Sequence, residues 1–218
     1  MAARTGTDER IPLSRERVLR CALTLADREG IAGLTIRTLA QELGSRPMSL
    51  YYYVANKEQI LDGIVDLVFG EVHLPVIGNP WREEMLVRAR SMREVLSRRP
   101  WAVGLLESRT HPGPATLRHH DATLGTLRSA GFTLRATAHA YALLDSYIYG
   151  FALQEVALPL SGADSVADVA APIMEQFSGG QYPWVMEIAT GIVMQPGYDF
   201  ADEFEYGLEL IFDGLDPR

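Results

Sequence analysis

The segment from Leu34 to Ile60, LTIRTLAQELGSRPMSLYYYVANKEQI, restricts the fold of this chain more than any other stretch. Thr35 is a good N-cap for a helix. Apolar residues follow at helical spacing, namely Leu39, Ala40 and Leu43. Gly44 can adopt the left-handed conformation that ends a helix, and Pro47 is tolerated in the first turn of the next one. The segment therefore predicts two short helices joined by a tight glycine turn.

Two helices joined in this way form a helix-turn-helix, which can place its second helix in the major groove of DNA. Asn56 followed by Lys57, Glu58 and Gln59 predicts a capping box at the start of a longer helix. Upstream, residues 14–29 carry an amphipathic helical pattern that ends at Gly30. The apolar side of this pattern consists of Val18, Leu19, Ala22, Leu25 and Ala26.

The run from Leu13 to about His73 resembles the DNA-binding domain of the TetR family of transcriptional repressors, in the branch that includes the tetracycline repressors. The matching motifs are "EGIAGLT" at the end of the first helix, then "IRTLAQELG", then "LYYYVANK" before the fourth helix. They cover roughly the first third of the chain, and the LY-x-x-V-x-NK ending is strongly specific. The resemblance implies a dimeric DNA-binding protein with an effector pocket in its C-terminal part.

The rest of the chain reads as helices separated by Pro and Gly, with no convincing strand pattern, so we predict an all-α fold. We expect an N-terminal arm and helix-turn-helix domain over residues 1–57, a connecting helix over 58–73, and a helical effector-binding and dimerisation domain over 74–218. Within this last domain we expect helices over 81–98 and 101–109, a loop over 110–114 that leads to a helix ending near Gly131, and a long helix over 132–156. We also expect a short helix before Gly179, a segment from Pro183, and a last helix capped by Asp199.

Charge is distributed unevenly along the chain. Residues 1–57 carry nine Lys and Arg against six Asp and Glu, whereas residues 58–218 carry eleven against twenty-two. A net charge of −8 for the whole chain thus coexists with a basic N-terminal module, which phosphate binding requires. The acidic remainder argues against a protein that binds DNA without specificity.

The side chains expected to contact DNA lie on the two short helices and at the start of the next. The predicted contacts are Thr35, Arg37, Arg46, Pro47, Ser49, Tyr51, Tyr53 and Lys57. The resemblance places Arg37, Pro47, Ser49 and Tyr53 at bases or adjacent phosphates, and Tyr51 and Lys57 at phosphates. Their chemistry agrees, because hydroxyl and ammonium groups donate to phosphate oxygens and Arg can bind guanine with two hydrogen bonds.

Three further residues complete this prediction. Leu50 and Val54 are expected to point inward. Tyr52 is expected to be exposed and to support the fold, and a DNA contact is the alternative. Tyr53 and Pro47 stand where the tetracycline-repressor branch often has His and Gln. The operator sequence of that branch is therefore not expected to apply here.

The resemblance implies an effector pocket between the helices at 81–98, 101–131 and 132–156. Inward-facing aromatic, Met and His side chains could line it, and each also fits an ordinary core position. The candidates are Trp81, Met85, Met92, Trp101, His139, Tyr141, Tyr147 and Phe151. We expect a small apolar effector and no cofactor.

The histidines do not predict a metal site. His111, His119, His120 and His139 form no i,i+4 pair, and adjacent His119 and His120 point to different faces of a helix. The tetracycline repressors use a histidine in the turn after their sixth helix to hold a drug-bound magnesium ion. The corresponding turn at 105–109 has no histidine, which argues against tetracycline–magnesium recognition.

The helices at 132–156 and 199–215 carry more apolar surface than one small domain needs. Pairing with their symmetry mates in a four-helix interface would bury it, as the resemblance also implies; ordinary core helices are the alternative. A homodimer would present two recognition helices about 34–36 Å apart, one turn of DNA.

These patterns predict a ligand-responsive transcriptional regulator, a repressor that binds a near-palindromic operator and is released by its effector. The alternative is a constitutive or architectural DNA-binding protein without a ligand. An enzyme is disfavoured because nucleophile-elbow, P-loop, dinucleotide and metalloprotease motifs are missing.

The chain is expected to be cytoplasmic and to have no membrane partner. Cys21 is the single cysteine, so no internal disulfide can form, and it is expected to be a small buried apolar residue. Residues 1–12 lack the apolar core of a signal peptide, and no apolar run approaches the ~20 residues that span a bilayer. The first residues are either a disordered basic arm or a frayed terminus.

Overall fold

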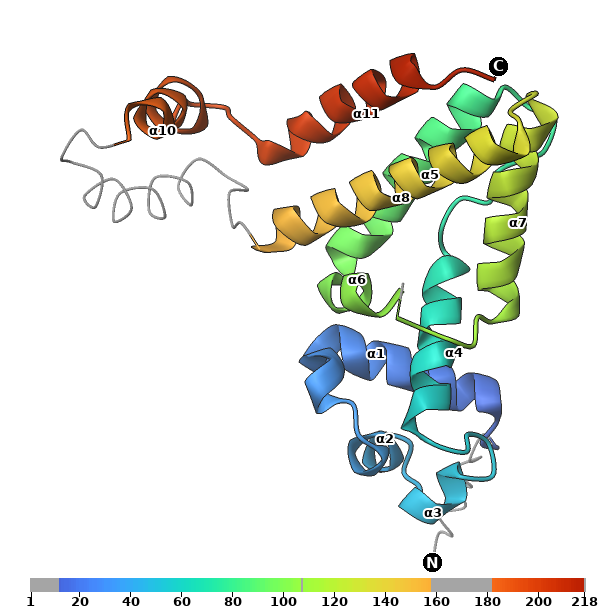
Figure 1. Ribbon diagram of the computed structural model, residues 1–218. Coiled ribbons are helices and arrows are strands. Elements are labelled where there is room, and N and C mark those ends of the chain that lie inside the picture. The colour runs from blue at the N-terminus through green and yellow to red at the C-terminus, as the bar shows by residue number, and fades with distance from the viewer. Residues whose placement is uncertain (1–11, 107, 158–181, 218) are drawn as a thin grey trace, which may run out of the picture. The chain divides into compact units, whose positions relative to one another are not determined.

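A computed structural model describes residues 12–106, 108–157 and 182–217, and these residues form helices with no strand among them (Figure 1). The all-α prediction is confirmed. The helices are α1 (Arg15–Gly33), α2 (Ile36–Glu42), α3 (Pro47–Leu50), α4 (Lys57–Phe69), α5 (Trp81–Arg98), α6 (Pro100–Leu106), α7 (Pro114–Ser129), α8 (Leu134–Ala157), α10 (Pro183–Ile188) and α11 (Glu203–Gly214). The short helix expected before Gly179, and the expected arm apart from Pro12, lie outside the described residues.

The chain forms two compact units. The first comprises Met1–Gly70 and Gly104–Thr116, and the second comprises Glu71–Val103 and Leu117–Arg218. We call them the N-terminal unit and the C-terminal unit. The functional boundaries expected at residues 57 and 73 stay a prediction.

The N-terminal unit is built on the packing of α1 against α4 and α2. The Ser14 side chain caps α1 by accepting a hydrogen bond from the backbone N–H of Arg17 at 3.1 Å. Gly30, with φ of 71°, interrupts α1 where the sequence pattern ends it. The core contains Val18, Ala22, Leu25, Leu39, Leu50, Val54, Ile64 and Val68, each at most 1% exposed.

The turn between α2 and α3 follows the prediction. Thr35 caps α2 through a reciprocal pair of hydrogen bonds with Thr38. Gly44 has φ of 59°, in the left-handed region, and Pro47 is the first residue of α3. The helix-turn-helix expected from the spacing of these residues is therefore present.

The cap of α4 differs from the predicted capping box in one detail. Asn56 accepts a hydrogen bond from the backbone N–H of Gln59 at 2.9 Å, as expected for an N-cap. The Gln59 side chain accepts from the backbone N–H of Ala55, also at 2.9 Å, rather than from Asn56. The Gln59 side chain therefore satisfies the amide of Ala55, the residue before the cap, in place of the amide of Asn56.

In the C-terminal unit, α5 packs along α8. Their buried side chains include Met85, Ala89, Met92, Leu96, Leu144 and Ile148. Glu84 binds the segment that precedes α5. Its carboxylate accepts hydrogen bonds from Asn79 Nδ2 at 2.7 Å and from the backbone N–H of Val76 at 3.1 Å. It also lies 2.8 Å from His73 Nε2. These bonds, that from Asn79 first, lower the pKa of Glu84.

The last helix, α11, starts at Glu203, four residues later than the predicted start at Asp199. Asp199 instead caps a 3-10 turn, in which its side chain accepts from the backbone N–H of Ala201 at 2.9 Å. A short 3-10 turn, Phe200–Asp202, leads into α11, and a π-helical turn, Ala189–Val193, follows α10. Phe204, Leu208 and Phe212 form the buried side of α11. None of the described helices combines the length and apolarity needed to cross a membrane.

Replacing Gly44 by Ala should reduce the free energy of unfolding by about 1–2 kcal/mol, because an L residue is strained in the left-handed conformation. Urea denaturation measures the change. Gly104→Ala is the matched control, because Gly104 lies in α6, has no positive φ and has open space at the Cβ position. That variant should be as stable as the wild type or up to about 1 kcal/mol more stable, and equal losses in both would contradict the explanation.

Candidate DNA-binding surface and effector site

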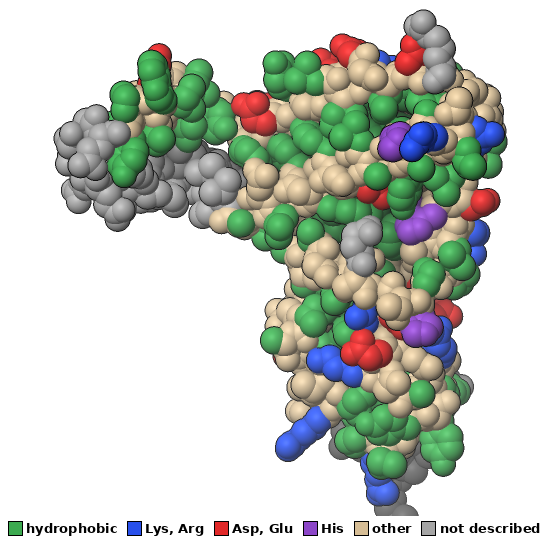
Figure 2. Space-filling view, in the orientation of Figure 1, with side chains coloured by type: hydrophobic (Ala, Val, Ile, Leu, Met, Phe, Trp, Pro, Cys, Tyr) green, Lys and Arg blue, Asp and Glu red, His purple; other side chains and the backbone are tan. Residues whose placement is uncertain are grey.

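The segment of α3 and the turn after it presents large side chains to solvent. Leu50 and Val54 are buried, as predicted. Met48 is 74% exposed, Tyr51 45% and Tyr52 89%. Large exposed apolar side chains that adjoin each other are typical of a contact surface. Figure 2 shows hydrophobic and basic side chains together at the end of the N-terminal unit that carries α2 and α3.

The expectation that Tyr52 supports the fold is wrong. α3 ends at Leu50, and Tyr51, Tyr52 and Tyr53 form the turn that follows it. In that turn Val54 takes the buried position. Tyr52 is thereby left on the surface and becomes available for contact.

The predicted DNA contacts lie on or beside the helix-turn-helix, from the start of α2 to the start of α4. Arg37, Pro47 and Tyr51 are exposed, and so are Thr35 and Arg46, the residues that precede α2 and α3. Ser49, Tyr53 and Lys57 are half-buried. Their assignment as DNA contacts stays a prediction.

Three cations of this surface are electrostatically distinct from their neighbours. Arg37, Arg46 and Lys57 form no ion pair with the residues that the structure describes. By contrast, Arg20 on α1 pairs with Glu16 at 2.8 Å, and Arg28 pairs with Glu29 and Glu42 at 3.0 and 3.1 Å. Cations without an internal carboxylate partner can neutralise phosphates without first breaking an ion pair.

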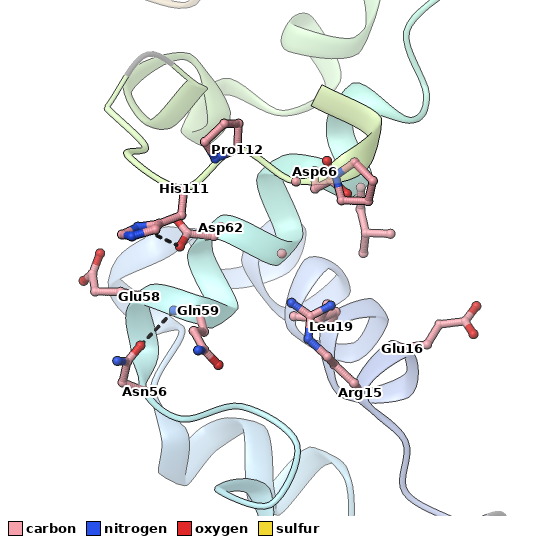
Figure 3. A pocket seen from close by; sticks show the side chains of 14 residues that line it. Arg15, Glu16, Leu19, Asn56, Glu58, Gln59, Asp62, Asp66, His111 and Pro112 are labelled. Carbon is pink, nitrogen blue, oxygen red and sulfur yellow. Dashed lines mark hydrogen bonds and ion pairs between the residues drawn. The ribbon is translucent and has the colours of Figure 1, made fainter. Parts of the chain in front are cut away.

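A pocket of about 890 Å³ lies within the N-terminal unit (Figure 3). It is bounded by α1, by α4 and by residues 111–114. Glu58, Asp62 and Asp66 follow one another every fourth residue along α4, so they lie on one face of that helix, and they line the pocket. The wall that α4 contributes is therefore acidic.

The same acidic face attaches the segment after α6 to α4. Arg109 donates to Glu58 at 2.7 Å, and its Nη1 lies 3.5 Å from Asp62 Oδ1. Thr116 donates to Asp66 Oδ1 through its backbone N–H at 2.8 Å and its hydroxyl at 3.0 Å. A side chain at Gly113 would collide with Asp66. Polar contacts at both ends of the segment thus fix it to α4.

The residues predicted to line an effector pocket are not all internal. Met85, Met92 and Phe151 are buried, whereas Trp81, Trp101, Tyr141 and Tyr147 are half-buried. His139 is exposed on α8, which contradicts its expected place among inward-facing residues. α8 is apolar on nearly every side, so periodicity could not assign its faces.

The inward-facing candidates also separate into different clusters. Trp81 contacts Phe132 edge-on, with ring centres 4.9 Å apart, and lies 5.8 Å from Phe212. Tyr147 stacks on Phe204 at 5.6 Å and donates to the Phe204 carbonyl at 3.0 Å. Both groups connect α11 to the rest of the C-terminal unit. Tyr147 also lines a pocket of about 510 Å³ together with Phe151, another of the predicted residues.

A third cluster contains charged residues that the sequence reasoning missed. Arg88 on α5 and Asp145 on α8 are 1% and 6% exposed, and Arg88 Nη2 donates to Asp145 Oδ1 at 2.5 Å. Arg88 Nε and Asp145 Oδ2 are buried and have no hydrogen-bond partner among the described residues. A signal existed in the sequence, because Arg88 lies between Met85 and Met92 on an apolar stripe.

Two histidines and a tyrosine surround this pair. The Arg88 guanidinium lies 5.9 Å from the centre of the Tyr141 ring, which contacts the His120 ring edge-on at 5.7 Å. His119 is buried, with its ring centre 6.2 Å from that of His120. Desolvation first, and the nearby Arg88 charge second, lower the pKa of His119 to about 3, so its imidazole is neutral at neutral pH.

The described residues contain no group of three or more His, Cys, Asp or Glu side chains arranged to hold a metal ion. Cys21 is half-buried on α1 rather than fully internal, and desolvation raises its pKa. Neither observation identifies a catalytic site among the described residues.

A helix-turn-helix within the basic segment 1–57, followed by a helical unit with a buried polar cluster, defines the class of helix-turn-helix transcriptional regulators. Residues 74–218 match the family described as tetracyclin repressor-like, C-terminal domain. The chain belongs to the TetR family of transcriptional regulators.

Similar proteins are found among actinobacterial regulators. The transcriptional repressor DrrR1 of Streptomyces coeruleorubidus is 32% identical over 94% of this chain and 77% of its own. A regulator of Saccharopolyspora erythraea is 35% identical over 63% of this chain, and the match spans only 59% of that protein. The TetR family protein ActR of Streptomyces coelicolor, solved in complex with (S)-DNPA, has a TM-score of 0.77 and 29% identity, covering 94% of this chain and 98% of that one.

Replacing Arg88 alone by Met should reduce the free energy of unfolding by about 3–5 kcal/mol, because it leaves the Asp145 carboxylate buried without its partner. Asp145→Leu alone should cost a similar amount. The double variant, which removes both charges and keeps apolar volume, should recover most of the loss. Thermal and urea denaturation measure the three variants, and additive losses in the double variant would show that the two residues are not coupled.

Proposed function

We propose that this protein is a ligand-responsive repressor that binds a near-palindromic operator as a homodimer and is released by a small-molecule effector. The observation that carries the proposal is the surface of the helix-turn-helix, where three cations without a described ion pair flank exposed tyrosines. Such a surface combines phosphate-binding charge with side chains that can reach base edges.

Each group of residues on this surface has a distinct role in the proposal. Lys57, with Tyr51, contacts phosphates and positions the protein on the duplex. Arg37 and Ser49, on α2 and α3, read base edges in the major groove. Tyr52, which is 89% exposed, adds a further contact, the alternative that the sequence had left open for this residue.

The homodimer is supported by apolar side chains on the surface of α8 and α11. On α8, Leu143 is 46% exposed and Leu153 59%; on α11, Tyr206 is 64% exposed and Leu210 59%. The sequence analysis predicted that the helices in these two regions, 132–156 and 199–215, form a four-helix interface with their symmetry mates. Covering exposed apolar area of this kind is what drives stable association.

The ligand response is supported by the relatives and by the C-terminal unit. ActR has been solved with actinorhodin as well as with (S)-DNPA. In this chain, the second unit holds buried polar atoms that lack partners among the described residues. A ligand that favours one conformation of this unit can shift the equilibrium only by its difference in affinity for the two states.

The route to DNA in this proposal is α4, the helix between the helix-turn-helix and the second unit. On its acidic face, Glu58 accepts a hydrogen bond from Arg109 at 2.7 Å. Asp66 accepts one from the backbone N–H of Thr116 at 2.8 Å. A change in the position of the segment after α6 would therefore be passed to α4. Because α4 follows the recognition segment directly, the spacing of the two DNA-reading surfaces would change with it.

Lys57→Ala should weaken binding to all DNA sites by a similar factor, and the slope of log affinity against log salt should fall by about one. Fluorescence anisotropy with labelled DNA from the region upstream of the gene, at several salt concentrations, measures both. Arg118→Ala removes the same charge from an exposed position on α7 and is the control. An unchanged salt slope for Lys57→Ala would remove this residue from the phosphate contacts.

Leu210→Glu should convert the homodimer to monomers and reduce operator binding strongly, because a carboxylate would be buried in the apolar interface. Sedimentation velocity and operator anisotropy test this. Leu117→Glu, at a position on α7 that is 54% exposed, is the matched control and should leave both properties unchanged. A dimer of normal stability for Leu210→Glu would place the interface elsewhere.

A further inference from the structure

The buried cluster of the C-terminal unit has a composition that packing alone does not explain. Three helices contribute to it: α5 with Arg88, α7 with His119 and His120, and α8 with Tyr141 and Asp145. Most other buried side chains of this unit are apolar, and the exceptions are Glu84, Thr123, Thr126 and Thr137. Removing a guanidinium and a carboxylate from water costs more than their contact usually returns, unless their remaining hydrogen-bonding atoms also find partners.

The pair does not use all of its hydrogen-bonding capacity within the chain. One bond joins Arg88 Nη2 to Asp145 Oδ1 at 2.5 Å. Arg88 Nε, a donor, and Asp145 Oδ2, an acceptor, are buried without a hydrogen-bond partner in the described residues. An Arg–carboxylate contact can form two parallel bonds, and this one forms a single bond. Each member of the pair therefore keeps one unused hydrogen-bonding atom, a donor on Arg88 and an acceptor on Asp145.

We propose that Arg88 and Asp145 form the polar anchor of the effector site and bind a neutral, planar aromatic molecule that carries a hydrogen-bond acceptor next to a donor. The acceptor receives the Arg88 Nε–H and the donor binds Asp145 Oδ2. This inference rests on the proposed ligand response and specifies its chemistry. Lactams and aromatic carboxamides have this arrangement.

The surrounding groups favour a neutral ligand over an ion. The Arg88 and Asp145 charges compensate each other, and the imidazole of His119 stays neutral because its pKa is lowered to about 3. A charged ligand would therefore be buried without a counterion. The Tyr141 and His120 rings, 5.7 Å apart and edge-on, supply aromatic surface beside the anchor.

The test uses the intact protein and two neutral probes, 2-quinolone and 2-naphthamide. Their methylated analogues, N-methyl-2-quinolone and N,N-dimethyl-2-naphthamide, keep the acceptor and lack the donor. Isothermal titration calorimetry measures their affinities. Each parent compound should bind the wild type about tenfold or more tightly than its methylated analogue, because the analogue leaves Asp145 Oδ2 unpaired. The anion 2-naphthoate should bind less tightly than 2-naphthamide.

The double variant Arg88→Met/Asp145→Leu assigns the difference to the pair. In this variant each parent compound and its analogue should bind equally, while the thermal transition and affinity for upstream DNA stay close to those of the wild type. If the variant does not fold, the parent-to-analogue ratio in the wild type still decides the matter. A ratio of one in the wild type, or no binding of either parent compound, would overturn the inference and leave the pair a structural one.

Anisotropy of labelled upstream DNA separates this inference from the proposed function. Preferential binding of the parent compounds without release of DNA would uphold the anchor and contradict the proposed ligand response. Release of DNA by apolar compounds, with no preference for the parents over their analogues, would uphold that response and contradict the anchor.

Discussion

Burial of Leu50 and Val54 decides where the proposed DNA-reading surface points. α3 has only four residues, and a helix of this length is not stable in water without tertiary contacts. These two side chains are at most 1% exposed, and they fix α3 and the following turn to the N-terminal unit. Because they are buried, Met48, Tyr51 and Tyr52 are left on the outside. The recognition surface is thus a consequence of core packing rather than of helix propensity.

The two units use charge in opposite ways. On the N-terminal unit, Arg37, Arg46 and Lys57 stay without described carboxylate partners, so they can exchange counterions for phosphates. In the C-terminal unit, Arg88 and Asp145 are removed from water and face each other. The first arrangement favours a long polyanion, and the second favours a small neutral molecule with a matching donor and acceptor. In the proposed function, the first arrangement binds DNA and the second binds the small molecule that regulates this binding.

Local features of the fold could be predicted from the sequence, and long-range ones could not. Gly44 and Pro47 act within a few residues, so their spacing sufficed to predict the turn and the start of α3. Arg88 and Asp145 are 57 residues apart in the sequence, and no local sequence pattern predicts their contact. His139 was misplaced because α8 is apolar nearly all round, which hides its buried face. The structural role favoured for Tyr52 was wrong because this residue lies in the turn after α3, where Val54 takes the buried position.

The central claim is that two copies of the α3 segment read one operator together. Hydroxyl-radical footprinting of the full-length protein on its upstream DNA tests it most directly. The account predicts two protected half-sites related by twofold symmetry, with centres about one helical turn, 10–10.5 base pairs, or a multiple of it apart. Protection of a single half-site, or protection without symmetry or sequence preference, would contradict it.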